Sequence, residues 1–282
     1  MIVHTEVAPF RRALEEARRD ERRVGLVPTM GFLHAGHRSL IDAAVSGNDV
    51  AALTIFVNPL QFAPTEDLAS YPRDLDHDLA VASDAGVAHV LAPTVEEMYP
   101  LPVITTVSVS GVSAPLEGAS RPTHFAGVAT VVAKLLNIAG PCRAYFGEKD
   151  FQQLAVVRRM VLDLSIPAEI VGCPTVREPD GLALSSRNVY LTPDERAAAP
   201  TLHRALLAGR ASIEAGERRA ASVRRVMHDI VEAEPLVQLD YAEVVDAGTF
   251  EVPAPLHGEL RLLIAARFSK ARLIDNVGAY AD

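Results

Sequence analysis

Apolar runs alternate with amphipathic stretches over the first 175 residues, and this alternation predicts the architecture. Runs that are apolar nearly throughout are typical of parallel strands covered on both faces, and they lie at 24–27, 50–57, 88–92, 143–146 and 168–173. Between them apolar residues recur at helical spacing, at 9–22, 39–45, 74–85, 125–137 and 154–161. Strands and helices that alternate in this way predict an α/β fold with a Rossmann-like open parallel sheet.

Two segments of this region have weaker patterns. The β-branched residues of 103–109 predict an edge strand or a small hairpin. The segment 63–73 is polar, contains prolines and has no clear period, so we expect a loop there. That loop is either a lid over a site or a plain surface connection.

The pattern changes after Pro193. An alanine-rich helix is predicted from Pro193 towards Gly216, with Thr192 as its N-cap, and a second helix covers about 219–233. Two antiparallel strands follow, at 236–245 and 260–267. We therefore expect a larger Rossmann-like domain over 1–175 and a smaller α+β domain over 176–282.

Composition narrows the class of protein. A chain of 282 residues with 49% hydrophobic content is long enough for about two domains with buried cores. A net charge of −9 argues against nucleic-acid or anionic-membrane partners. The two cysteines fit a reducing compartment, and no apolar run approaches the length of a membrane span. We expect a cytoplasmic protein that binds neither nucleic acid nor membrane.

The stretch from Pro28 to His37 predicts a phosphate site. It reads as strand, glycine turn and helix, and the free N–H groups and dipole at a helix start favour an anion. A P-loop is excluded because His37 and Arg38 stand where Lys and Ser or Thr would be needed. A pair of surface histidines is the plain alternative, and no third ligand for a metal lies at zinc-like spacing. The H-x-G-H motif of His34 and His37, placed directly after a strand, favours the functional interpretation.

Two further clusters have candidate phosphate chemistry. Lys149, in Gly147–Asp150, would stand at a helix start, where the dipole disfavours a cation unless an anion is bound beside it. The alternative is a solvated lysine balanced by its acidic neighbours. The run Ser185, Ser186 and Arg187 offers hydroxyls and a guanidinium for an oxyanion, although such a run alone is usually an ordinary polar loop.

Together these residues resemble the pantothenate synthetase family, whose members are also called pantoate beta-alanine ligases. The matching segments occur in family order: Pro28–Gly31 with His34 and His37, 56–62, 71–73, 121–128, 146–153, 176–178 and 185–188. The resemblance implies the H-x-G-H nucleotidyltransferase type of fold. It also implies a two-step reaction: ATP and pantoate give pantoyl adenylate and pyrophosphate, and then beta-alanine displaces AMP to give pantothenate.

The resemblance also implies roles for residues. His37, His34 and Lys149 would be catalytic, and Gln61 and Gln153 would bind pantoate or beta-alanine. The ATP-binding set would be Met30, Gly31, Phe32, Leu33, His34, Ala35, Gly36, His37, Gly147, Glu148, Lys149, Asp150, Val176, Leu184, Ser185, Ser186 and Arg187. Leu184 stands where the family often has Met, a volume-conserving change. Mg²⁺ would be held largely by ATP oxygens, so no protein ligand is predicted. A homodimer is expected as well. The apolar 125–137 helix is either a buried core helix or part of the subunit interface.

Two other functions stay open at this point. A nucleotidylyltransferase would use the same H-x-G-H fold but release an adenylated product. A nucleotide-sensing module would bind ATP without turnover, although it would have no stated need for Gln61 and Gln153.

Overall fold

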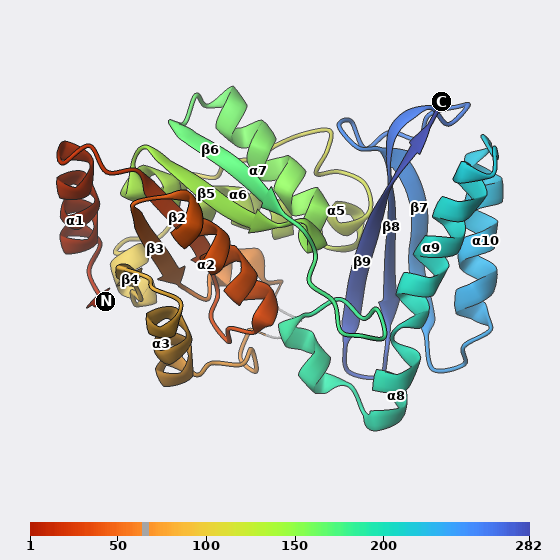
Figure 1. Ribbon diagram of the computed structural model, residues 1–282, viewed down its shortest axis with the longest axis horizontal. Coiled ribbons are helices and arrows are strands. Elements are labelled where there is room, and N and C mark those ends of the chain that lie inside the picture. The colour runs from red at the N-terminus through yellow and green to blue at the C-terminus, as the bar shows by residue number, and fades with distance from the viewer. Residues whose placement is uncertain (64–67) are drawn as a thin grey trace. The chain divides into compact units, whose positions relative to one another are not determined.

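The computed structural model describes residues 1–63 and 68–282, and the chain divides into two compact units (Figure 1). The first unit comprises Met1–Glu148 and Gln152–Pro174. The second comprises Lys149–Phe151 and Thr175–Asp282. Lys149 therefore belongs to the second unit, although the residues on either side of Lys149–Phe151 belong to the first.

The first unit is built on a six-stranded sheet whose neighbouring strands all pair in parallel, in the order β1-β4-β3-β2-β5-β6. Its strands are β1 (Ile2–His4), β2 (Val24–Thr29), β3 (Val50–Ile55), β4 (His89–Leu91), β5 (Cys142–Gly147) and β6 (Ala168–Cys173). The predicted α/β class and open parallel sheet are confirmed. β1 was not predicted, because its three residues are too few to show a period.

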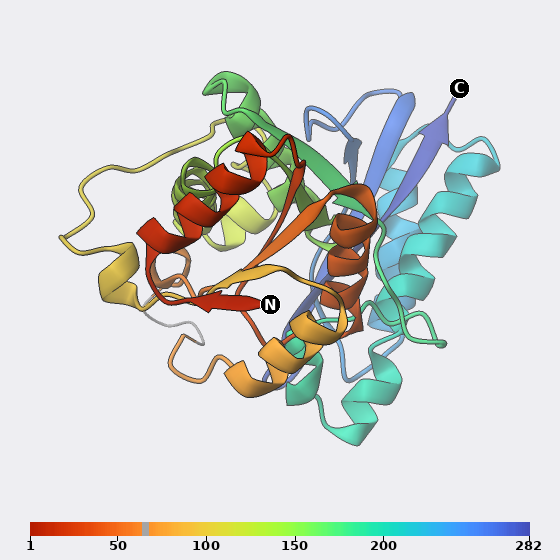
Figure 2. The same ribbon diagram turned by 60° about the vertical axis from the view of Figure 1, so that its left-hand side comes forward.

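Helices cover both faces of this sheet, as Figure 2 shows for α1 (red) and α2 (orange-red). One buried cluster joins α1, α6 and α7 to the strands, and another joins α2 and α3 to the opposite face. The helices are α1 (Val7–Arg19), α2 (Ala35–Gly47), α3 (Leu75–Asp84), α4 (Val95–Met98), α5 (Glu117–Ser120), α6 (His124–Ala139) and α7 (Phe151–Asp163), with 3-10 turns η1 (Pro59–Gln61) and η2 (Glu148–Asp150).

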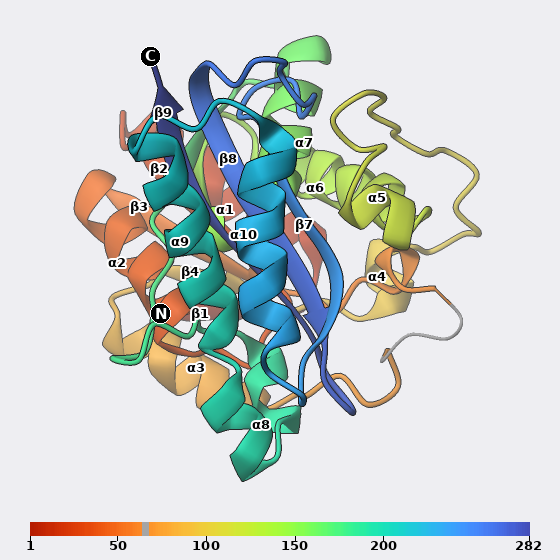
Figure 3. The ribbon, with the colours of Figure 1, turned by 90° about the vertical axis from the view of Figure 1, so that its right-hand side faces the viewer.

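The second unit packs helices on a three-stranded antiparallel sheet of order β7-β8-β9. Figure 3 shows α9 and α10 side by side over one face of that sheet. The elements are η3 (Ser186–Tyr190), α8 (Pro193–Ala198), α9 (Thr201–Glu214), α10 (Ala220–Glu232), β7 (Gln238–Asp246), β8 (Gly258–Arg267) and β9 (Arg272–Ala281).

Three expectations are corrected. Residues 103–109 form no strand: the Val107 N–H donates to Thr130 Oγ1 of α6 at 3.0 Å instead of to a neighbouring strand. The single helix predicted after Pro193 is two helices, because Pro200 has no N–H to continue the first. The apolar face of α6 is buried in the core of its own unit, so it is not available as a dimer interface.

The predicted lid over 63–73 lies partly outside the described residues. No helix within residues 1–63 and 68–282 is both long enough and apolar enough to cross a membrane.

Candidate functional site

In the first unit, the candidate site lies where the strand order reverses. β2 lies between β3, which follows it in the chain, and β5, which is reached only after β4. The connections that leave β2 and β5 therefore diverge, and ligands of open α/β sheets bind in the crevice at such carboxyl ends. The H-x-G-H stretch follows β2, and Glu148 follows β5.

His34 and His37 form the first turn of α2 together. His34 is the N-cap: its Nδ1 accepts from the Gly36 N–H at 3.1 Å, while His37 Nδ1 accepts from the His34 N–H at 3.4 Å. Their ring centroids lie 4.1 Å apart. Because both Nδ1 atoms accept, the proton of each neutral ring sits on Nε2. Each ring of this first turn therefore carries its proton on Nε2, and an N–H donor of this kind suits an anion.

The loop before this turn is held by a buried carboxylate on α3. Asp78 is 1% exposed, and its two oxygens accept from the Phe32 N–H at 2.8 Å and the Leu33 N–H at 2.6 Å. Burial raises the pKa of the Asp78 carboxyl, and these two N–H groups oppose that rise. Gly31 and Phe32 both adopt positive φ, at 83° and 52°. Asp78 therefore stabilises a backbone conformation that Phe32 rarely adopts.

Gln61 lies in η1, at the carboxyl end of β3, because Pro59 cannot extend a central strand. Its Nε2 donates to Met30 Sδ at 3.1 Å, so the structure brings together two residues predicted to bind substrates. Its Oε1 accepts from Asn58 Nδ2 at 3.1 Å, and Asn58 is 1% exposed. The Gln61 side chain is therefore held through its oxygen by the buried amide of Asn58.

On the β5 side, Gly147 ends the strand, and Gln153 lies half-buried in α7. A Cβ added at Gly147 would meet no described atom within 4 Å, so the space above this residue is open. The neighbouring Gln152 is buried, and its Nε2 donates to the Val112 and Pro115 carbonyls at 2.8 Å each. Gln152 thus fixes the start of α7.

In the second unit, Lys149 is attached to the last strand. Asn276 of β9 donates from Nδ2 to the Lys149 carbonyl at 2.8 Å, and Arg261 of β8 donates from Nε to Asn276 Oδ1 at 2.6 Å. The Arg261 guanidinium also lies 3.9 Å from the ring centroid of Phe151. The Lys149 ammonium contacts the Asp150 carboxylate at 3.4 Å. The backbone at Lys149 is therefore set by the antiparallel sheet.

The predicted ATP-binding residues Val176, Leu184 and Ser185–Arg187 lie in one segment of the second unit, 176–187. The Leu184 N–H donates to the Val176 carbonyl at 3.0 Å, and Ser185 caps η3 by accepting from the Arg187 N–H at 3.3 Å. A small cavity is lined by residues of both this segment and η2, among them Lys149, Ser185, Asn188, His203 and Asp275. Within this unit the structure therefore brings Lys149 and Ser185 to the same cavity.

An ion pair anchors this segment to β9. Arg177 donates to both oxygens of the buried Asp275, at 2.6 and 2.8 Å, and to the Gly181 carbonyl at 3.0 Å. Planar two-point pairing of this kind fixes both position and orientation. It holds the turn at Pro179–Gly181, where Gly181 takes φ 95°.

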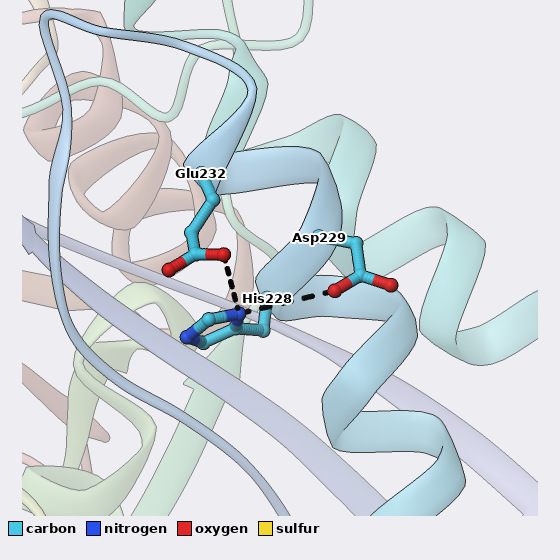
Figure 4. Close-up of side chains that lie close together, drawn as sticks. All are labelled: His228, Asp229 and Glu232. Carbon is cyan, nitrogen blue, oxygen red and sulfur yellow. Dashed lines mark ion pairs between the residues drawn. The ribbon is translucent and has the colours of Figure 1, made fainter.

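One group of potential metal ligands lies outside these sites. Among the described residues, only His228, Asp229 and Glu232 bring three such side chains together (Figure 4). All three are exposed on α10, and His228 Nδ1 lies 3.3 Å from a Glu232 oxygen, as in an ordinary i,i+4 ion pair. This arrangement is that of a solvated helix face.

Several residues that shape the site were missed in the sequence. These residues belong to no recognisable motif, and most of their hydrogen bonds reach residues far away in the chain: Asp78, Tyr99, Asn276 and Arg261. The acidic first turn of α3 was the one local signal that could have pointed to Asp78.

Comparison with known proteins agrees with the geometry. The family model described as pantoate-beta-alanine ligase matches residues 2–278. The pantothenate synthetase of Moorella thermoacetica is 54% identical over 271 residues, which cover 96% of each chain. The crystal structure of pantothenate synthetase from Thermus thermophilus has a TM-score of 0.94 at 50% identity and covers 99% of this chain and 100% of its own.

A more distant solved structure is the pantoate-beta-alanine ligase of Francisella tularensis. It has a TM-score of 0.82 at 33% identity and covers 98% of this chain and 97% of its own. The resemblance carried by the segments from Pro28–Gly31 to 185–188 is confirmed: the chain belongs to the pantoate-beta-alanine ligase family.

Proposed function

We propose that this chain makes pantothenate from pantoate, beta-alanine and ATP through a pantoyl adenylate. A pantoate carboxylate oxygen would attack the α-phosphorus of ATP, and pyrophosphate would leave. The beta-alanine amine would then attack the acyl carbon, lose a proton and release AMP. The observation that carries the proposal is the pair of Nε2–H donors at the start of α2, at the carboxyl end of β2 beside β5.

His34 and His37 are proposed to bind the phosphates of ATP. The carboxylate nucleophile of the first step needs no base, so catalysis there is positioning and stabilisation of the charge that moves onto pyrophosphate. Two Nε2–H donors at a helix start supply that stabilisation. His37 is also the residue from which a proton can pass to a phosphate oxygen.

The remaining members of the predicted ATP set are proposed to bind the same nucleotide. The backbone of Met30–Gly36 and of Gly147–Glu148 would contact it, and Gly147 has the open space that a close approach needs. Lys149 and Leu184–Arg187 would bind its phosphates, and Val176 would contact its adenine through backbone groups. Asp150 belongs to the same ATP-binding set. The Francisella tularensis protein was crystallised in complex with beta-gamma ATP and beta-alanine, which supports both substrates for this chain.

Gln61 and Gln153 are proposed to hold pantoate or beta-alanine. Their amides are neutral donors and acceptors that suit hydroxyl and carboxylate groups. Mg²⁺ is proposed as a companion of ATP. Among the described residues, no group of three carboxylate or imidazole side chains lies at the α2 turn, so phosphate oxygens rather than protein ligands would hold the ion.

The decisive assay is pyrophosphate exchange into ATP with and without pantoate, followed by AMP release on adding beta-alanine. His37→Ala and Lys149→Ala should each lose most of the exchange, because each removes a phosphate contact. His228→Ala and Lys270→Ala are matched controls, since both residues are exposed in the second unit. Exchange near the wild-type rate in His37→Ala or Lys149→Ala would contradict the assigned role.

The same assay separates the alternatives. A nucleotidylyltransferase would release an adenylated product without an amine, and a nucleotide sensor would bind ATP without exchange. Family membership favours the ligase over both.

A homodimer and a cytoplasmic location are proposed as well. The extended segment after α4 exposes Leu101 (77%) and Ile104 (96%), which fits an apolar surface covered by a second copy. Cys142 and Cys173 are buried and unpaired, and burial raises the pKa of Cys142 to about 12, which fits a reducing compartment. Light scattering of Ile104→Asp, compared with wild type, tests the dimer.

The loop at 63–73 is proposed as the lid that protects the adenylate from water. Deleting several of its residues should raise adenylate hydrolysis relative to pantothenate formation. Unchanged partitioning would argue for a plain surface connection.

A further inference from the structure

A chain of hydrogen bonds leads from the end of α4 to Gln61. The Tyr99 hydroxyl donates to Asn58 Oδ1 at 2.8 Å, and Asn58 Nδ2 donates to Gln61 Oε1 at 3.1 Å. All three residues belong to the first unit. The orientation of the Gln61 amide therefore depends on the orientation of the Asn58 amide.

The Tyr99 hydroxyl and two backbone groups together determine which way the Asn58 amide faces. The Leu60 N–H, which can only donate, points to Oδ1 at 3.3 Å, and the Gly127 carbonyl, which can only accept, receives Nδ2 at 3.2 Å. Asn58 is 1% exposed, so water does not compete for these bonds. Its Nδ2 side consequently faces Gln61, whose oxygen must turn towards it.

This arrangement commits Gln61 to act as a donor on its other side. Its Oε1 is taken by Asn58, and its Nε2 faces Met30 Sδ at 3.1 Å. A thioether is a weak acceptor. An oxygen of a bound substrate would be a better partner for this amide, so the site is prepared for a carboxylate or hydroxyl oxygen.

Tyr99 is itself anchored. Its ring packs edge-on against Phe56, with centroids 5.9 Å apart, and the Lys134 ammonium lies 5.1 Å from its centroid while donating to the Met98 carbonyl. Burial raises the pKa of Tyr99 to about 12, so the hydroxyl keeps its proton at any physiological pH. The donor to Asn58 is therefore fixed in place and always present.

We propose that Tyr99 is a positioning residue for the acid substrate: through Asn58 it holds the Gln61 amide with its NH₂ towards an oxygen of pantoate. This inference rests on the proposed role of Gln61. The Tyr99 hydroxyl bonds to Asn58, and its effect on the substrate passes through Asn58 and Gln61.

The test replaces Tyr99 with Phe, which removes the hydroxyl and keeps the ring contacts. We expect the KM for pantoate to rise about tenfold, the size of one lost hydrogen bond. The KM for ATP and the melting temperature should stay close to those of the control. That control is Tyr145→Phe, which removes another buried hydroxyl in the same unit, bonded to Asn48 at 2.8 Å.

A double-mutant cycle separates positioning from a general structural effect. Gln61→Ala alone should raise the KM for pantoate, and adding Tyr99→Phe to it should raise that KM no further, because the hydroxyl acts through Gln61. Equal effects of Tyr99→Phe in both backgrounds would overturn the inference. So would loss of folding in Tyr99→Phe, or a KM for pantoate equal to that of the Tyr145→Phe control.

The outcome for Gln61→Ala alone tests the proposed function. If that variant binds pantoate as wild type does, the assignment of Gln61 fails, and the role of Tyr99 fails with it. If Gln61→Ala is impaired and Tyr99→Phe is not, only the role of Tyr99 fails.

Discussion

Replacing Asp78 with Asn tests whether the loop before the H-x-G-H turn is held by a carboxylate. In the wild type each oxygen accepts one backbone N–H, from Phe32 at 2.8 Å and from Leu33 at 2.6 Å. An asparagine keeps one acceptor and turns an NH₂ towards the other N–H. One of the two hydrogen bonds is therefore lost, and a buried donor faces another donor.

The magnitude follows from these contacts. A hydrogen bond to a charged group is worth about 1.5–3 kcal/mol. Burying the charged carboxylate of Asp78 has a cost, as the raised pKa of this group indicates. The asparagine variant avoids that cost, and this offsets part of the loss. We expect a net loss of about 2 kcal/mol in the free energy of unfolding, or about 4–8 °C in the melting temperature of a unit of this size.

The catalytic effect should exceed the effect on stability. Phe32, at φ 52°, is expected to relax towards a common conformation once its N–H is released. His34 and His37 follow within five residues, so their rings would shift. A displacement of about 1 Å at catalytic groups can cost about 100-fold in rate, and we expect a loss of that order in kcat/KM for ATP.

The assay pairs thermal unfolding with steady-state kinetics in Asp78→Asn and in Asp84→Asn. Asp84 lies on the same helix, but it is exposed and paired with Arg38 at 2.6 Å, so its loss should cost less than about 1 kcal/mol. If both variants lose the same small amount of stability and keep kcat/KM for ATP, the loop is not held by Asp78.

Three further predictions concern other parts of the chain. Asn276→Ala should raise the KM for ATP several-fold without a change in the KM for pantoate, because the Lys149 carbonyl loses its donor; equal changes in both constants would contradict this. Gly127→Ala should destabilise the protein and raise the KM for pantoate, because the new Cβ would lie 2.2 Å from the Leu60 carbonyl oxygen. Gly147→Ala should keep the wild-type melting temperature and lose affinity for ATP, because a Cβ there would meet no described atom within 4 Å. The pKa of Glu195 is lowered from 4.5 to about 2, chiefly by the Thr192 N–H. The stability that this carboxylate contributes is therefore present above about pH 4.5 and is lost as the pH falls towards 2. The difference in melting temperature between wild type and Glu195→Gln should shrink over that range, and a constant difference would refute the linkage.

The position and the orientation of Gln61 show how much of the site could be predicted from the sequence. The Pro59 turn after an apolar run placed Gln61 at the end of β3, because a proline cannot extend a central strand. Nothing in the sequence indicated which way its amide faces, since that depends on Asn58 and on Tyr99, 41 residues further along the chain. The same limit applies to Lys149, whose backbone is held by Asn276 from 127 residues away.

The sequence by itself determined the local elements: which runs become buried strands, where α2 begins, and which residues follow β2 and β5. These depend on periodicity, capping and turn chemistry within a few residues. Only the tertiary structure decided the strand order and the partners of Asp78, Tyr99 and Asn276. Those features depend on how elements far apart in the chain pack and pair. The sequence around a residue does not indicate which distant group its side chain will contact.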